Sequence, residues 1–295
     1  MHGYVDLLSD RDLTALAKLS GHGPANGDAP GWFRAAPERI EAALGTTATT
    51  DALFGLDEAA PTPVPLPLDA ITPLLVFAAV IHRSADDITD ATHVPERIGG
   101  GLVVPVFDGG RLADFVAAGA NRLFLVELLG SYTRVMSGPR WERSRGRWRR
   151  RRFSEMNPAQ LARLAADLPA EERAGAYRRL GDLALFLNGV FADHSVRQTL
   201  APIDLERIVG SVPRHHPGRS GVVQRLQSDR VDSVGAVLGA LGPLWYQLAA
   251  DLVPLPAMRH QLGHMAEHFD QARRFLTFTT DRWLFPQRDR LFPTI

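Results

Sequence analysis

The sequence contains no cysteine, which excludes disulfide bonds, thiolate metal ligands and cysteine nucleophiles. Lysine is almost as scarce, because Lys18 is the only lysine among 33 basic residues and the rest are arginines. The absence of cysteine favours a reducing compartment. The N-terminus also lacks the basic start and apolar run of a secretion signal, so we expect a cytoplasmic protein.

Long apolar runs are also few. Residues 233–250 (SVGAVLGALGPLWYQLAA) carry no formal charge, but their length only just reaches that of a membrane span. Pro243, Gln247 and several glycines weaken that interpretation, so we expect a buried central helix and no membrane partner. The chain has 295 residues, of which 45% are apolar and 22% charged, which predicts a globular protein with a substantial core.

Helix signals dominate the chain. Ser9 is expected to cap a helix over 10–19, Asn157 a helix that starts at Pro158, and two long helices should cover roughly 231–251 and 257–283. We predict a mainly α fold, a helical bundle with a small β element made of an Arg-rich hairpin and one short strand at 101–107.

Domain boundaries are indicated by a proline-rich stretch. Residues 59–68 are expected to form an extended connector, because prolines at this density prevent hydrogen-bonded structure. This connector would separate a small helical N-terminal subdomain, 1–58, from the main helical domain, 69–295, which includes the Arg-rich ribbon 140–153.

The densest charge lies in residues 140–153, RWERSRGRWRRRRF. Charged and other residues nearly alternate around Gly146, which predicts a two-stranded ribbon with its turn at Arg145-Gly146. In that register Arg143 faces Trp148, Trp141 faces Arg150, and these four share a face with Arg152.

Arginine binds phosphate through two parallel hydrogen bonds and stacks on aromatic rings. The leading hypothesis is therefore a non-catalytic binding or regulatory protein with an anionic partner, either nucleic acid or a phosphorylated ligand. The residues expected to bind it are Arg140, Arg143, Arg147, Arg149, Arg150, Arg151, Arg152, Trp141 and Trp148.

A structural role for the same ribbon needs no outside ligand. Residues 140–152 carry eight arginines and one glutamate, net +7, in a chain whose net charge is zero. Residues 51–97 hold eight acidic and two basic residues, net −6. The ribbon could pair with this acidic segment within one chain or in a homo-oligomer. Because the whole chain is neutral, it would attract a polyanion only through a local positive patch such as the ribbon.

A histidine-rich segment, 259–271 (RHQLGHMAEHFDQ), offers a different chemistry. His260, His264 and His268 follow one another at intervals of four, and Glu267 lies on the same side of the helix. Two imidazoles one turn apart can chelate Zn²⁺ or Fe²⁺, so the alternative function is a metal-dependent enzyme with these histidines as ligands and Glu267 as ligand or base.

Two features weaken the metalloenzyme interpretation. His264 to His268 match the H-x-x-E-H pattern of one protease class, but no glutamate follows Glu267 to supply the further acidic ligand. An apolar stripe lies opposite the histidines, so they could equally form a solvated or interfacial polar face. The stripe consists of Leu262, Met265, Phe269, Ala272 and Leu276.

Three segments resemble a group of uncharacterised bacterial proteins. They are residues 121–138 (NRLFLVELLGSYTRVMSG), 149–155 (RRRRFSE) and 177–191 (YRRLGDLALFLNGVF), about a third of the chain with their surroundings. The resemblance implies no activity, cofactor or fold, and it assigns no functional residue.

Overall fold

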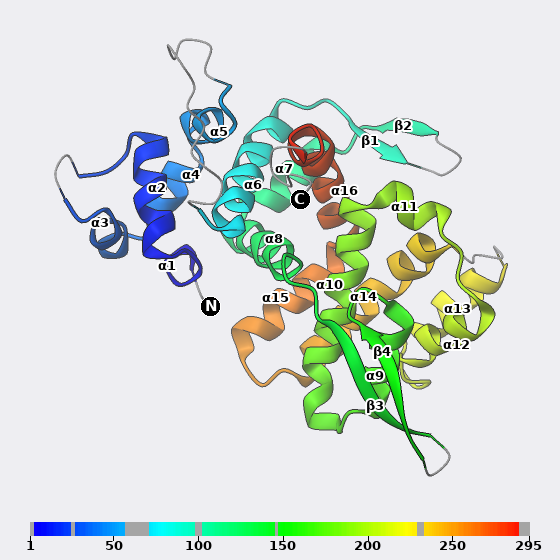
Figure 1. Ribbon diagram of the computed structural model, residues 1–295. Helices are drawn as coiled ribbons and strands as arrows, with labels where there is room; N and C mark the ends of the chain where they lie inside the picture. Colours follow the sequence, from blue (N-terminus) through cyan, green and yellow to red (C-terminus); the bar gives the residue numbers. More distant parts are fainter. Residues whose placement is uncertain are drawn as a thin grey trace. The chain divides into compact units, whose positions relative to one another are not determined.

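The computed structural model describes residues 3–24, 27–56, 71–97, 102–144, 147–228 and 233–288. At positions 140, 142–144, 147–149, 151 and 196 it describes the backbone alone. Helices dominate the described chain, with two small two-stranded antiparallel sheets (Figure 1), which confirms the predicted mainly α fold. The proline-rich connector predicted at 59–68 lies outside the described residues.

The chain divides into two compact units. Unit 1 comprises residues 1–96, 105–133 and 274–295, and unit 2 comprises residues 97–104 and 134–273. The helices of unit 1 are α1 (Tyr4–Leu7), α2 (Asp10–Ser20), α3 (Ala29–Ala35), α4 (Glu38–Leu44), α5 (Thr47–Phe54), α6 (Pro73–Thr89), α7 (Gly109–Ala117), α8 (Gly119–Ser131) and most of α16 (Phe269–Thr279), followed by a π-helical turn at Thr280–Leu284.

Unit 2 carries the longer hairpin and most of the remaining helices. Its elements are β3 (Ser137–Ser144), β4 (Arg147–Ser154), α9 (Pro158–Asp167), α10 (Arg173–Val190), α11 (Ala192–Arg197), α12 (Pro202–Gly210), α13 (Arg219–Ser228), α14 (Val234–Leu252) and α15 (Pro256–Glu267). The second sheet pairs β1 (Val94–Arg97) with β2 (Val103–Val106), so the strand predicted at 101–107 is present and its partner was not predicted.

Local capping signals locate several helix ends in unit 1. The Ser9 hydroxyl accepts the backbone N–H of Asp12, and Gly21 ends α2 with a φ of 66°, a left-handed conformation that favours glycine. The buried Asp12 carboxylate also accepts the N–H of Thr72 at 2.7 Å, the residue that precedes α6. The same carboxylate accepts the N–H of Ser9 at 3.0 Å, so it caps α2 and also ties α2 to the start of α6.

Unit 1 also buries a pair of polar side chains. Nε2 of His82 lies 3.0 Å from the hydroxyl of Tyr4, and both side chains are almost fully buried. Burial first, and the nearby charge of Arg122 second, lower the pKa of His82 from 6.5 to about 3. Burial also raises the pKa of Tyr4 above its usual range, so both groups are neutral at pH 7.

The core of unit 2 is the contact between α10 and α14. Gly181 lies against the ring of Tyr246, where an added Cβ would come within 2.7 Å of the ring, and Gly242 lies against Phe269 and Ala184. The Tyr246 hydroxyl donates to Asp182 at 2.9 Å. Gly181 of α10 therefore lets the ring of Tyr246 approach the helix backbone, and Gly242 of α14 does the same for the ring of Phe269.

The uncharged run 233–250 forms a buried helix, as predicted. Trp245 and Tyr246 of α14 are completely buried, and Nε1 of Trp245 donates to the hydroxyl of Ser211 at 2.9 Å. Among the described helices, α14 included, not one combines the length and the apolar character that crossing a membrane requires.

The helix predicted over 257–283 is not continuous. His268 separates α15 from α16, with φ −108° and ψ 25°, and the helical path ends in the π-helical turn at 280–284. Two interactions accompany the break: the His268 side chain bonds back to the His264 carbonyl, and the ring of Phe269 packs against Gly242 and Tyr246. The apolar stripe of this segment is buried, as its spacing predicted.

Candidate functional site

The arginine-rich ribbon forms the hairpin β3–β4 in the register predicted from its sequence. Trp141 pairs with Arg150, Arg143 with Trp148, and Pro139 with Arg152. Because side chains alternate along a strand, positions 141, 143, 148, 150 and 152 belong to one face of the hairpin. The opposite face carries positions 140, 142, 147, 149 and 151, so arginine occurs on both faces.

Three described side chains of the ribbon are open to solvent. The indole of Trp141 is 61% exposed, which is unusual for a residue of this size, and Arg150 and Arg152 are exposed as well. In the part of the ribbon whose side chains are described, no ion pair or hydrogen bond engages either arginine. The side chains of Arg140, Arg143, Arg147, Arg149, Arg151 and Trp148 lie outside the described ones.

The base of the hairpin is fixed by residues that the sequence analysis missed. Glu155 forms an ion pair with Arg179 of α10, and its other carboxylate oxygen accepts the N–H of Met136 at 2.9 Å. The N–H of Ser154 donates to Gln160 of α9 at 2.8 Å. Asn157 caps α9, as predicted, by accepting the N–H of Gln160 at 3.0 Å. The base of the ribbon is therefore attached to α9 and α10 of its own unit.

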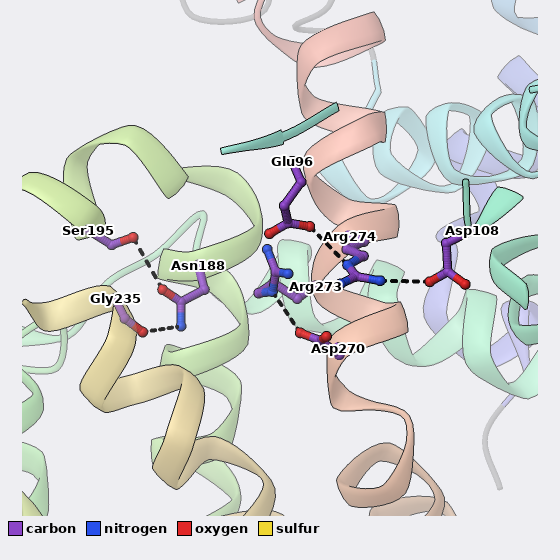
Figure 2. Close-up of polar contacts among 8 residues, drawn as sticks. All are labelled: Glu96, Asp108, Asn188, Ser195, Gly235, Asp270, Arg273 and Arg274. Carbon is purple, nitrogen blue, oxygen red and sulfur yellow. Dashed lines mark hydrogen bonds and ion pairs between the residues drawn. The ribbon is translucent and has the colours of Figure 1, made fainter. Parts of the chain in front are cut away.

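The acidic segment 51–97 already has arginine partners within unit 1. Asp87 accepts hydrogen bonds from Arg282 at 2.6 Å and from the indole N–H of Trp283 at 3.0 Å. Arg274 lies between Glu96 and Asp108 (Figure 2), at 2.9 Å and 2.7 Å. Asp57, Glu58 and Asp69 lie outside the described residues. Two carboxylates of the segment thus have cationic partners that are not part of the ribbon.

Figure 2 also shows polar contacts of unit 2, two of them between helices and one within a helix. Asn188 of α10 donates to the carbonyl of Gly235 at 3.0 Å and accepts the hydroxyl of Ser195 at 3.2 Å. Arg273 pairs with Asp270 at 3.1 Å, three residues earlier in α16. Each contact satisfies a polar group at a helix contact or on a helix surface, so these residues stabilise the fold.

The histidine segment brings three of its four candidate ligands together. One ligand atom from each of His264, Glu267 and His268 lies within 4.8 Å of the others, and this is the only group of its kind among the described residues. The ring centroids of His264 and His268 are 4.1 Å apart. His260 lies outside the group and is exposed, and its ring centroid is 6.5 Å from that of His264.

Electrostatics favour the neutral form of the His264 imidazole. Partial burial and the neighbouring imidazoles of His268 and His260 lower the pKa of His264, while Glu267 opposes the shift. Nδ1 of His268 lies 3.0 Å from the carbonyl oxygen of His264, and a carbonyl can only accept, so Nδ1 carries the hydrogen. The remaining nitrogen of that ring, Nε2, therefore keeps its lone pair when the ring is neutral.

Comparison of this chain with protein-family models, with curated proteins and with solved structures found no match.

Proposed function

We propose that this protein is a non-catalytic nucleic-acid-binding protein whose hairpin β3–β4 contacts the phosphate backbone. The observation that carries the proposal is the register of the hairpin, because it puts Trp141 opposite Arg150 and beside Arg152 on an open face. An aromatic ring flanked by guanidinium groups is suited to stack a base while its neighbours hold phosphates.

The charge of the segment supports the same partner. Residues 140–152 carry net +7 in a neutral chain, so the densest positive charge available to a polyanion lies in this hairpin. A two-stranded ribbon also has the width that the major groove of duplex DNA admits.

The test compares wild type with Arg150→Ala/Arg152→Ala in fluorescence-anisotropy titrations, using labelled duplex and single-stranded oligonucleotides between about 50 and 200 mM salt. If each guanidinium neutralises one phosphate, the salt slope for duplex falls by about 2 in the variant. A matched control is Arg207→Ala/Arg214→Ala, which removes two exposed arginine charges of unit 2 outside the ribbon and should leave the slope unchanged.

Trp141→Ala separates stacking from charge. Base stacking on an aromatic side chain contributes about 1–3 kcal/mol, so affinity for single strands should fall roughly 5-fold to 150-fold while duplex affinity changes little. Undetectable binding by wild type, or equal loss in the ribbon and control variants, contradicts the proposal. Competition by inorganic phosphate at the concentration that displaces an oligonucleotide would instead indicate a small phosphorylated ligand.

A further inference from the structure

The cluster of His264, Glu267 and His268 has the composition of a metal site. Two imidazole nitrogens and one carboxylate oxygen form the ligand set with which proteins bind Zn²⁺ at sites that also hold water. Ligands of a tetrahedral zinc ion lie about 3.4 Å from one another, because each is about 2.1 Å from the metal. The ligand atoms here already lie within 4.8 Å of one another, so small side-chain rotations would complete the site.

The orientation of His268 supplies a second, independent observation. Metal-binding histidines commonly donate their non-ligating N–H to a backbone carbonyl, which fixes the ring and its tautomer. His268 makes this bond to the carbonyl of His264, so its Nε2 is the nitrogen with a lone pair. The hydrogen bond therefore fixes the tautomer of His268, with Nε2 available as a ligand atom, before any metal ion binds.

The backbone beneath the cluster is held by packing. Leu262, Met265 and Phe269, which alternate with the candidate ligands along the chain, are buried in unit 2. Because the apolar side fixes the end of α15, the polar side of the same turn keeps its histidines at constant spacing. Glu267 is exposed and its side chain can rotate, so it is the ligand best able to adjust to an ion.

From this arrangement we infer that His264, Glu267 and His268 bind one divalent transition-metal ion of the Zn²⁺ class, with water completing the coordination. The donors are nitrogen and oxygen, a set that suits Zn²⁺, Ni²⁺ and Cu²⁺ better than the all-oxygen preference of Mg²⁺ and Ca²⁺. The inference does not depend on the proposed nucleic-acid binding, because no residue of the hairpin takes part.

The test uses full-length protein without a polyhistidine tag, stripped of metal by a chelator. Zn²⁺ is titrated in competition with a chromogenic indicator, and Co²⁺ replaces Zn²⁺ in a second titration because its visible spectrum reports coordination geometry. We expect one Zn²⁺ per chain with a Kd below about 100 µM. Mg²⁺ should not compete.

Variants identify the ligands. His268→Gln and Glu267→Gln should each weaken Zn²⁺ binding by roughly tenfold or more, and Glu267 is exposed, so its replacement leaves the core intact. His260→Gln is the matched control, since it removes an exposed imidazole of the same helix from outside the cluster, and should change affinity less than about twofold. Failure of wild type to bind one Zn²⁺ below about 100 µM, or equal weakening by His260→Gln and His268→Gln, overturns the inference.

Discussion

His82 should make unit 1 sensitive to mild acid. Its imidazole is 5% exposed and lies 3.0 Å from the buried Tyr4 hydroxyl. In the native state its pKa is lowered to about 3 by burial and by Arg122, whereas in the unfolded chain it is that of free histidine, 6.5. Between these values the unfolded state binds a proton that the native state does not, so stability falls as pH decreases.

The size of the effect follows from the two pKa values. Over most of that interval the free energy of unfolding decreases by about 1.4 kcal/mol per pH unit, and the contribution is almost complete above about pH 7. Between pH 7 and pH 5 the loss amounts to about 2 kcal/mol, and at pH 3 it reaches about 4 kcal/mol. Two kcal/mol is a large fraction of the stability of a typical domain.

The assay is urea unfolding followed by tryptophan fluorescence at pH 7 and pH 5. Wild type should lose about 2 kcal/mol more than His82→Gln, which keeps a polar group near Tyr4 but does not titrate. His93→Gln removes an exposed histidine of unit 1 and should behave like wild type. Parallel losses in wild type and His82→Gln would refute the assignment of acid sensitivity to His82.

Three further substitutions, two of them with a matched control, test interactions within the units by urea unfolding. Asp12→Ala leaves the N–H groups of two helix starts without their acceptor and should cost about 2–4 kcal/mol, whereas the exposed Asp10→Ala should cost less than about 0.5 kcal/mol. Gly242→Ala forces a methyl group against an aromatic ring and should cost about 1–3 kcal/mol. Gly263→Ala, in open space on α15, should instead be neutral or stabilising. Arg274→Ala leaves two carboxylates without their shared cation and should cost about 1–3 kcal/mol, and a cost near zero would show that the triad is not stabilising.

Features that depend on neighbouring residues were the ones that the sequence could predict. Ser9 and Gly21 mark the ends of α2, and Asn157 with Pro158 marks the start of α9, because the capping atoms lie within three residues of the groups they satisfy. Alternation around Gly146 gave the register of the ribbon for the same reason. In each case the physical cause is local.

Features that depend on distant residues could not be predicted in this way. The contact of Arg274 with Glu96 joins positions 178 residues apart, and no periodicity relates them. The break at His268 lacks a neighbouring proline and coincides with packing of the following ring on a helix about 25 residues earlier. Sequence reasoning identified the three candidate ligands that cluster, but it also included His260, which the structure keeps outside their group.

The hairpin is attached to its own unit at its base, through Glu155, Ser154 and Arg179. Replacing Glu155 or Arg179 should weaken this attachment, whereas the exposed Trp141, Arg150 and Arg152 can be exchanged with little loss of stability. An engineer could therefore keep this base as a fixed stem and vary the side chains at positions 141, 150 and 152.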